Sequence, residues 1–166
     1  MIKSAVISPD GVYRYRLERR WDELVSKKFT VCWIMLNPSV ADATKDDPTI
    51  RKCMGFSQRW GYGGMIVVNL YAYRATSPQD LALAIALREA MGPMNVNAVG
   101  LALDDCDRAI VAWGSNAPSP PREILKVLKY HQRNIECFRP LTKNGQPPHP
   151  LMLPYSTLTD EWSRPP

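Results

Sequence analysis

The sequence lacks long hydrophobic runs, and this absence excludes a membrane-spanning protein. The longest uncharged apolar segment, residues 65–73, is far shorter than the roughly 20 residues that a membrane helix needs. Residues 1–4 do not lead into the long apolar segment that is typical of a secretory signal. We therefore expect a protein that is located in the cytoplasm and makes no membrane contact.

Metal-binding and phosphate-binding motifs are also missing. The cysteines at positions 32, 53, 106 and 137 form no Cys-x-x-Cys pair and have no pair of histidines near them, which speaks against a zinc or iron–sulfur site. The sequence contains no glycine-rich phosphate loop and no lysine–serine pair of the P-loop type. We expect no metal and no cofactor, and we interpret the cysteines as buried, reduced thiols.

What is present is the composition of one ordinary globular domain spanning residues 1–166. Hydrophobic residues make up 45% of the 166 positions and charged residues 22%, which excludes a disordered or fibrous chain. The net charge is 21 − 16 = +5, and the only dense basic group lies between residues 14 and 20. This charge is compatible with a nucleic-acid partner and equally with a solvated basic face. The sequence does not indicate an oligomeric state.

Apolar segments that read as strands alternate with segments of helical spacing. A hairpin is predicted at about 3–20 and a proline-rich loop and tail at about 140–166. Core strands are predicted at 31–36, 64–73, 109–113 and 134–138, and helices at 46–61, 77–90, 94–103 and 121–131. Because the strands are too apolar for an exposed face, the pattern predicts a three-layer α/β/α fold. Its central sheet is mainly parallel, its core covers about 30–153, and the N-terminal hairpin adds an antiparallel edge.

Polar side chains follow the predicted core strands, where ligands bind in open parallel sheets. Amides offer adjacent donors and acceptors that match the edge of a nucleobase, and aromatic rings offer a stacking face. The candidate catalytic residues are Asn37, Asp42 and His149. The candidate substrate-binding residues are Pro38, Ser39, Phe56, Asn69, Tyr71, Arg74, Trp113, Gly114 and Ser115.

Several of these residues have a structural alternative. Asn37 precedes a proline and is equally well explained as a turn residue. The amide of Asn69, in an apolar strand, must bond either a ligand or a neighbouring loop. Asp47 is best interpreted as a helix cap, whereas His149, between two prolines, is better explained by function than by core packing. Trp113 is either a core residue or a wall of the site.

Six motifs resemble a bacterial family catalogued as domain of unknown function 1643, over about residues 30–153. They are LNPSVAD at 36–42, DDPTIR at 46–51, WGYGG at 60–64, VVNLYAYRA at 67–75, AWG at 112–114 and TKNGQPPHPL at 142–151. The resemblance names relatives and implies no reaction.

The same blocks resemble, more distantly, the uracil-DNA glycosylase superfamily in their order and in their position on the sheet. That superfamily has an Asp/Asn-Pro motif after the first core strand, a Leu-Asn segment on the next strand, a Leu-Trp-Gly-Ser strand end and a final His-Pro loop. The resemblance implies that Asn37 positions the attacking water and that Asn69 reads the pyrimidine edge. It also implies that Tyr71 or Phe56 stacks on the base.

The final loop is expected to complete the site. The resemblance implies that His149 stabilises negative charge on a base oxygen. It implies that Leu151 and Met152 wedge into the space left by a flipped nucleotide. The chain departs from the superfamily at Leu36, which replaces a glycine, and at Asn37, where the most active members have aspartate. Because an amide is not a general base, proton abstraction either falls to Asp42 or is absent.

We therefore expect a glycosylase-like domain that binds a nucleobase, in nucleic acid or in a nucleotide, and that hydrolyses an N-glycosidic bond. Two alternatives remain open at this point. One is a non-catalytic nucleic-acid or nucleotide-binding module that kept the pocket, and the other is a structural or partner-binding domain whose polar strand ends only cap loops.

Overall fold

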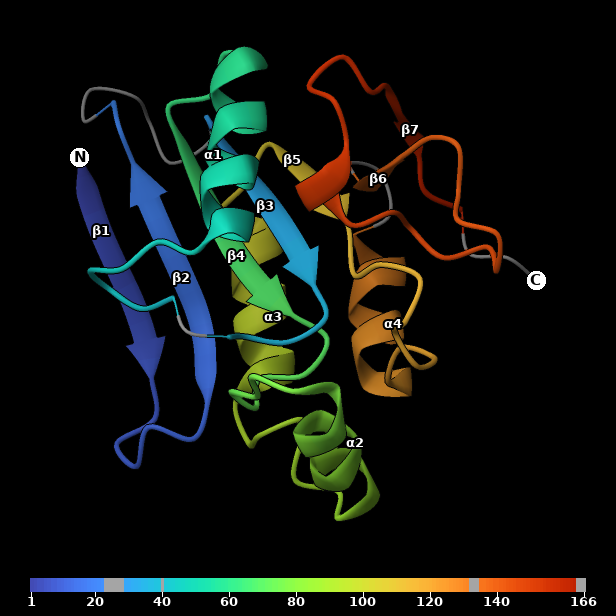
Figure 1. Cartoon of the computed structure of the whole chain (residues 1–166). Helices are drawn as coiled ribbons and strands as arrows, with labels where there is room; N and C mark the ends of the chain where they lie inside the picture. The colour runs from blue at the N-terminus through green and yellow to red at the C-terminus, as the bar shows by residue number, and fades with distance from the viewer. Residues whose placement is uncertain (23–28, 40, 132–134, 164–166) are drawn as a thin grey trace.

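A seven-stranded sheet forms the centre of the computed structural model, which describes residues 1–22, 29–39, 41–131 and 135–163 (Figure 1). The strand order is β1-β2-β4-β3-β5-β6-β7. The four strands β4, β3, β5 and β6 run parallel, whereas β1, β2 and β7 are antiparallel to their neighbours. The strands are β1 (Ile2–Ile7), β2 (Arg14–Arg20), β3 (Thr30–Met35), β4 (Gly64–Asn69), β5 (Arg108–Val111), β6 (Ile135–Phe138) and β7 (Thr159–Glu161).

Helices cover both faces of the sheet, so the described residues form three layers (Figure 1). The helices are α1 (Pro48–Arg59), α2 (Pro78–Ala86), α3 (Asn95–Asp104) and α4 (Arg122–Tyr130), with a short 3-10 helix η2 (Pro150–Met152). Residues of α1 pack with one face, and residues of α2, α3 and α4 pack with the other. Within the described residues, none of these helices is long and apolar enough to cross a membrane.

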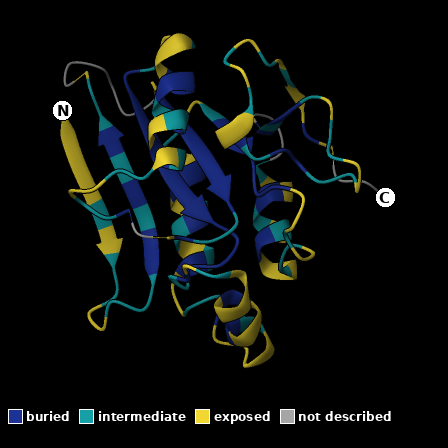
Figure 2. Ribbon diagram, in the orientation of Figure 1, coloured by how far each residue is buried: buried dark blue, intermediate teal, exposed yellow. Residues whose placement is uncertain are grey.

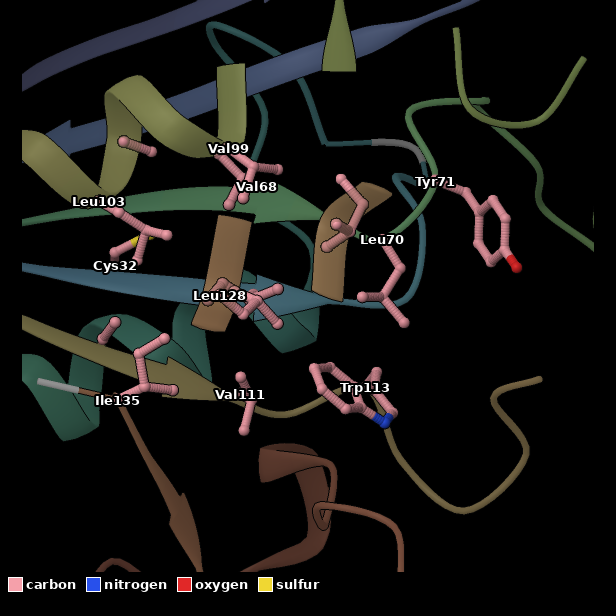
Figure 3. Packing of buried hydrophobic residues seen from close by; sticks show 14 of the residues in the cluster. Cys32, Val68, Leu70, Tyr71, Val99, Leu103, Val111, Trp113, Leu128 and Ile135 are labelled. Atoms are coloured by element: carbon pink, nitrogen blue, oxygen red, sulfur yellow. The ribbon is translucent and has the colours of Figure 1, made fainter. Parts of the chain in front are cut away.

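Alternation along the central strands explains how both faces are buried. On β3, Cys32 and Ile34 join the cluster beneath α3 and α4, whereas Trp33 joins the cluster beneath α1. Every residue of β3 and β4 is buried (Figure 2). Figure 3 shows Val99 of α3 and Leu128 of α4 packed against this first face. The uninterrupted apolar runs in the sequence therefore reflect strands that are buried on both sides.

The strand order creates the location for a site. The chain passes from β3 to β4 on one side and then returns to β5 on the other side of β3. At such a switch point the connections leave the carboxyl ends of neighbouring strands in opposite directions, and a crevice opens between them.

The α/β class, the parallel central strands and the antiparallel N-terminal hairpin were predicted correctly. Three larger differences concern the ends of two elements and one additional strand. The strand predicted at 64–73 ends at Asn69. The backbone carbonyls of Asn69 and Leu70 accept hydrogen bonds from the side chain of Asn95, whereas in a continued strand they would accept from the backbone of a neighbouring strand. The helix predicted to residue 90 ends at Ala86. Two residues later Arg88 takes a positive φ of 61°, a conformation that is common directly after a helix.

The third difference is β7, which was not predicted within the proline-rich tail. Residues 159–161 contain no proline and pair with β6 in antiparallel register, from Glu136↔Glu161 to Phe138↔Thr159. The strand predicted at 134–138 corresponds to β6, and its first predicted residue, Asn134, lies outside the described residues.

Candidate functional site

A pocket of about 750 Å³ opens beyond the carboxyl ends of β3, β4 and β5, at the switch point of the sheet. Its walls come from segments far apart in the sequence, because the parallel strands deliver their connections to the same edge. The polar residues that line it are Arg14, Asn37, Ser39, Asp47, Thr49, Asn69, Thr76, Ser77, Ser115, Asn116 and His149. Apolar residues complete the lining, among them Met35, Ile50, Val67, Leu81 and Trp113.

Asn69, the last residue of β4, contributes an amide that has no partner among the described residues. The residue is 1% exposed, and neither Oδ1 nor Nδ2 makes a hydrogen bond. Leaving a buried polar group unpaired costs about 1–3 kcal/mol. Nearby Asn95 does not relieve it, because the Asn95 amide donates instead to the backbone carbonyls of Asn69 and Leu70. The structural alternative for Asn69, a bond to a neighbouring loop, is therefore not seen within the described residues.

Asn37 stabilises the turn after β3 and also lines the pocket. Its Nδ2 donates to the carbonyl of Pro38 at 2.9 Å and to the carbonyl of Ala75 at 3.1 Å. These bonds connect the segment after β3 to the segment that leads into α2. The residue also lines the pocket, so the turn interpretation and the site placement both hold for it.

His149 enters the pocket from the loop before η2. Its Nδ1 accepts a hydrogen bond from the N–H of Leu151 at 3.3 Å, which assigns the ring proton of the neutral imidazole to Nε2. Burial lowers the pKa of His149 below its ordinary 6.5, against the opposing effect of the negative charge of Asp47. The neutral form is therefore favoured at pH 7.

Gly114 allows this loop to approach the end of β5. It has a φ of +87°, and its N–H donates to the carbonyl of Pro147 at 2.9 Å. A Cβ at this position would lie 3.2 Å from the Cβ of His149. Glycine is therefore needed here both for its backbone conformation and for the space it leaves.

Among the described residues that line the pocket, the one carboxylate belongs to Asp47. Asp42 is not among the lining residues. Its Oδ1 accepts from the backbone N–H groups of Thr44 and Lys45 at 2.8 and 2.9 Å and from the hydroxyl of Thr44, and these bonds lower the pKa of Asp42 to about 2. Asp42 is thus a turn-forming residue.

Asp47 is the N-cap of α1, as the sequence predicted. Its Oδ1 accepts from the N–H of Ile50 at 2.8 Å. It also lines the pocket, which the interpretation as a cap did not include. The signal was available: the connection from β3 to α1 begins at the carboxyl edge of the sheet, so the first residues of α1 lie at the same edge.

Arg14 is a site residue that sequence reasoning missed. It lies at the start of β2 and is 3% exposed. Its Nη1 donates to the carbonyl of Ala41 at 2.6 Å, while its buried Nε has no partner. Burial lowers the pKa of Arg14 to about 10, with the charge of Asp47 acting in the opposite direction, so the guanidinium remains charged at neutral pH.

Four residues assigned to substrate binding do not line the pocket. Tyr71 is buried as a member of the cluster on the face of α2, α3 and α4, and Figure 3 shows it beyond Leu70. Phe56 packs in the core between Trp33 and Tyr155. The other two are Pro38 and Arg74, the latter donating to the carbonyl of Gly11. Neither aromatic ring is available for stacking in the pocket, because both lie inside the core.

The remaining candidates lie in or beside the pocket. Trp113 is buried and lines it, and its Nε1 donates to Oε1 of Gln146 at 2.7 Å, so it is core residue and pocket wall together. Ser39 and Ser115 are exposed lining residues. Leu151 and Met152 in η2 follow His149 and are 38% and 88% exposed; their role as a wedge stays a prediction. Among the described residues no cluster of three metal-ligating side chains occurs.

Comparison with known proteins gives the family but no activity. No curated protein matches the chain, and no solved structure matches it either. The family model described as protein of unknown function (DUF1643) matches residues 14–151, a range that contains every residue lining the pocket. The chain therefore belongs to the DUF1643 family.

Proposed function

We propose that the pocket binds a nucleobase, and that Asn69 recognises its edge. The observation that carries this proposal is the buried amide of Asn69, whose donor and acceptor both lack a partner although the residue lines a cavity. An amide presents a donor and an acceptor side by side, and the edge of a nucleobase presents the complementary pair. Binding such an edge would satisfy both atoms at once.

The walls of the pocket support a flat, partly apolar ligand. Met35, Val67 and Trp113 give it apolar surface. A volume of about 750 Å³ lies within the usual range of small-molecule sites, which combine apolar walls with a few convergent polar groups. This is the balance that a heterocyclic base requires.

The distant resemblance to uracil-DNA glycosylases supports the same reading. The Asn-Pro, Val-Asn, Trp-Gly-Ser and His-Pro blocks contribute Asn37, Asn69, Gly114 and His149 to one pocket. We take the glycosylase-like arrangement of these blocks as part of the proposal.

A second candidate function, hydrolysis of an N-glycosidic bond, is favoured by the presence of Asp47 and His149 in the same pocket. In this reaction the bond between C1′ and the base nitrogen breaks, and its electron pair leaves with the base. The oxygen of a water molecule bonds to C1′, and the water proton passes to the carboxylate of Asp47. The Nε2–H of neutral His149 would donate to a base oxygen, where negative charge develops.

Ligand-induced thermal stabilisation tests the binding proposal. The melting temperature is measured with free bases and with their nucleosides, since a ligand that binds only the folded state raises it. We expect stabilisation by at least one base, abolished in Asn69→Leu and retained in Asn97→Leu, a surface asparagine of α3. If no base or nucleoside raises the melting temperature, the binding proposal is wrong and a structural or partner-binding role is favoured.

Release of free base, measured by chromatography, tests the hydrolysis. Asp47→Asn keeps a capping oxygen and removes the charge, so we expect it to reduce release by at least about 100-fold. Asp42→Asn is the matched control and should leave the rate within about twofold, because Asp42 does not line the pocket. Binding without release would leave the first proposal standing and overturn the second.

A further inference from the structure

A buried guanidinium without a full set of partners lies in the same pocket as Asn69. Arg14 donates one hydrogen bond, from Nη1 to the carbonyl of Ala41, and its Nε makes none. No ion pair of Arg14 is found within the described residues, although it lies within the electrostatic influence of Asp47. Because a buried charge is costly unless it is paired, Arg14 is suited to receive an anion inside the cavity.

The helices that meet the pocket add to this preference. Both α1 and α2 present their amino ends to it, through Asp47 and Thr49 on one side and Ser77 and Pro78 on the other. The amino end of a helix carries a partial positive charge and favours anions. Carboxylates offset part of this charge at both helices, Asp47 as the N-cap of α1 and Asp80 in the first turn of α2. The guanidinium of Arg14 is therefore the main group that remains for an anionic ligand.

The burial of Arg14 selects the kind of anion. At 3% exposure the guanidinium is reached only by a group that enters the cavity. A terminal phosphate monoester can enter with the rest of its molecule, whereas an internal phosphodiester carries a further nucleotide on each side and remains at the surface. A planar guanidinium with free N–H donors binds phosphate well.

We propose that the ligand is a nucleoside monophosphate, whose terminal phosphate binds Arg14 while its base binds Asn69. This inference rests on the proposed nucleobase site and adds its substrate class. Arg14 and Asn69 lie on β2 and β4, which are paired in the sheet, and a cavity of about 750 Å³ holds base, sugar and phosphate together. Arg14 is then a specificity-determining residue for the phosphate.

Calorimetric titration of the full chain tests the proposal through the ratio of two dissociation constants, that of a nucleoside and that of its monophosphate. The dissociation constants of each common nucleoside, of its 5′-monophosphate and of its 3′-monophosphate are measured in the same buffer. We expect one monophosphate to bind at least tenfold more tightly than its nucleoside. In Arg14→Gln that ratio should fall to near one, while the affinity for the nucleoside changes little. Because each ratio is taken within one protein sample, partial unfolding of the variant cancels.

Arg74→Gln is the matched control. Arg74 also has a buried Nε without a partner, but it does not line the pocket, so its ratio should equal that of the original chain. Equal affinities for nucleoside and monophosphate in the original chain, or a ratio that survives Arg14→Gln, would overturn the phosphate assignment. If Arg14→Gln does not fold, Arg14→Lys replaces it, and the ratio should fall at least threefold.

Two further ligands separate failure of this inference from failure of the nucleobase proposal. Ribose 5-phosphate has a terminal phosphate and no base, and its binding should depend on Arg14 and not on Asn69. If it binds and no base does, the phosphate site stands and the nucleobase proposal fails. A single-stranded ten-nucleotide DNA without terminal phosphates should bind more weakly than the monophosphate, and tighter binding of this DNA would overturn the choice of a mononucleotide.

Discussion

Two crevices lie at opposite ends of the same sheet, and their polar side chains differ in how fully they are hydrogen-bonded. At the amino ends of the strands, Arg108 donates from Nε and Nη2 to Glu136 at 3.0 and 2.6 Å and from Nη2 to the hydroxyl of Thr159 at 2.5 Å. Its guanidinium also lies 4.2 Å from the centre of the Trp60 ring. At the carboxyl ends, and within the part of the chain that the structure describes, the side chain of Arg14 has one hydrogen bond and that of Asn69 has none.

The difference supports the carboxyl-end pocket as the candidate ligand site. The amino-end crevice is rich in charge, and its one guanidinium among the described residues, that of Arg108, is already bonded to Glu136 and Thr159. The carboxyl-end pocket has fewer charges and leaves buried donors and acceptors open, at a cost to stability. Unpaired polar groups, rather than the number of charges, therefore distinguish the candidate site.

The largest effect on stability is expected at the amino end. Glu136→Leu removes the acceptor for both Arg108 bonds and for the hydroxyl of Thr159. Hydrogen bonds to charged groups contribute about 1.5–3 kcal/mol each at most, and the pair is partly exposed, so we expect the free energy of unfolding to fall by about 2 kcal/mol. Urea denaturation measures it. Binding at the other crevice should stay within about twofold, and a loss of binding would mean that the two crevices are coupled.

At the carboxyl end, replacing a polar side chain by leucine should raise the free energy of unfolding instead of lowering it. Asn69→Leu removes two buried unpaired atoms and adds an apolar side chain beside Met35 and Val67. We expect the free energy of unfolding of the unliganded chain to rise by about 1 kcal/mol, and the melting temperature by about 2–4 °C. The same variant should no longer bind ligand. If it is destabilised instead, the amide of Asn69 serves the fold.

A pair of glycine substitutions tests the shape of the pocket. Gly114→Ala and Gly145→Ala both place a side chain at positive φ, but only at Gly114 would the new Cβ meet another residue, His149. Each should lower the free energy of unfolding by about 1 kcal/mol. Gly114→Ala should in addition weaken ligand binding, whereas Gly145→Ala should not. Equal binding by the two variants would show that the position of His149 is not critical.

The smallest effect expected is a pH dependence at the carboxyl end. The pKa of His149 is lowered by burial in the folded chain, so the unfolded chain takes up its proton first as the pH falls. The stability contributed by neutral His149 is complete above pH 6.5 and is lost as the pH falls from 6.5 through the folded pKa. Denaturation between pH 7 and 5 should show this loss, and His149→Gln should reduce it.

The chain offers one other histidine as a control for this measurement. His131 lies at the end of α4, with Nδ1 3.8 Å from Asp104. His131→Gln should keep the loss of stability on acidification. If both variants behave like the original chain, the acid sensitivity comes from other groups.

The sequence was sufficient for strands β1 to β6 and for the edge of the sheet where the pocket opens. Residues 31–35 and 64–68 are apolar without interruption, which indicates strands buried on both faces, and polar residues at the ends of parallel strands must gather at one edge. Asn37, Asn69 and His149 were selected in this way, and all three line the pocket.

The residues that were missed or misplaced depend on long-range packing. The hairpin pattern does not reveal that β2 pairs with β4, and that pairing brings Arg14 to the carboxyl edge. Similarly, nothing local in the sequence tells whether Tyr71 and Phe56 face the cavity or the core, because both positions lie in apolar segments. Asp42 and Asp47 both lie in the connection from β3 to α1. The way this connection folds places Asp42 in a turn and Asp47 at the start of the helix.

The antiparallel docking of the N-terminal hairpin has a practical consequence for anyone who trims this chain. A fragment that begins at residue 30 would retain β3, β4, β5 and β6, yet it would lose the only guanidinium among the described residues that line the pocket. It would also leave the edge of β4 with open backbone hydrogen-bonding groups, which invite aggregation. The hairpin thus protects the sheet and completes the binding wall, and the smallest fragment worth expressing must include it.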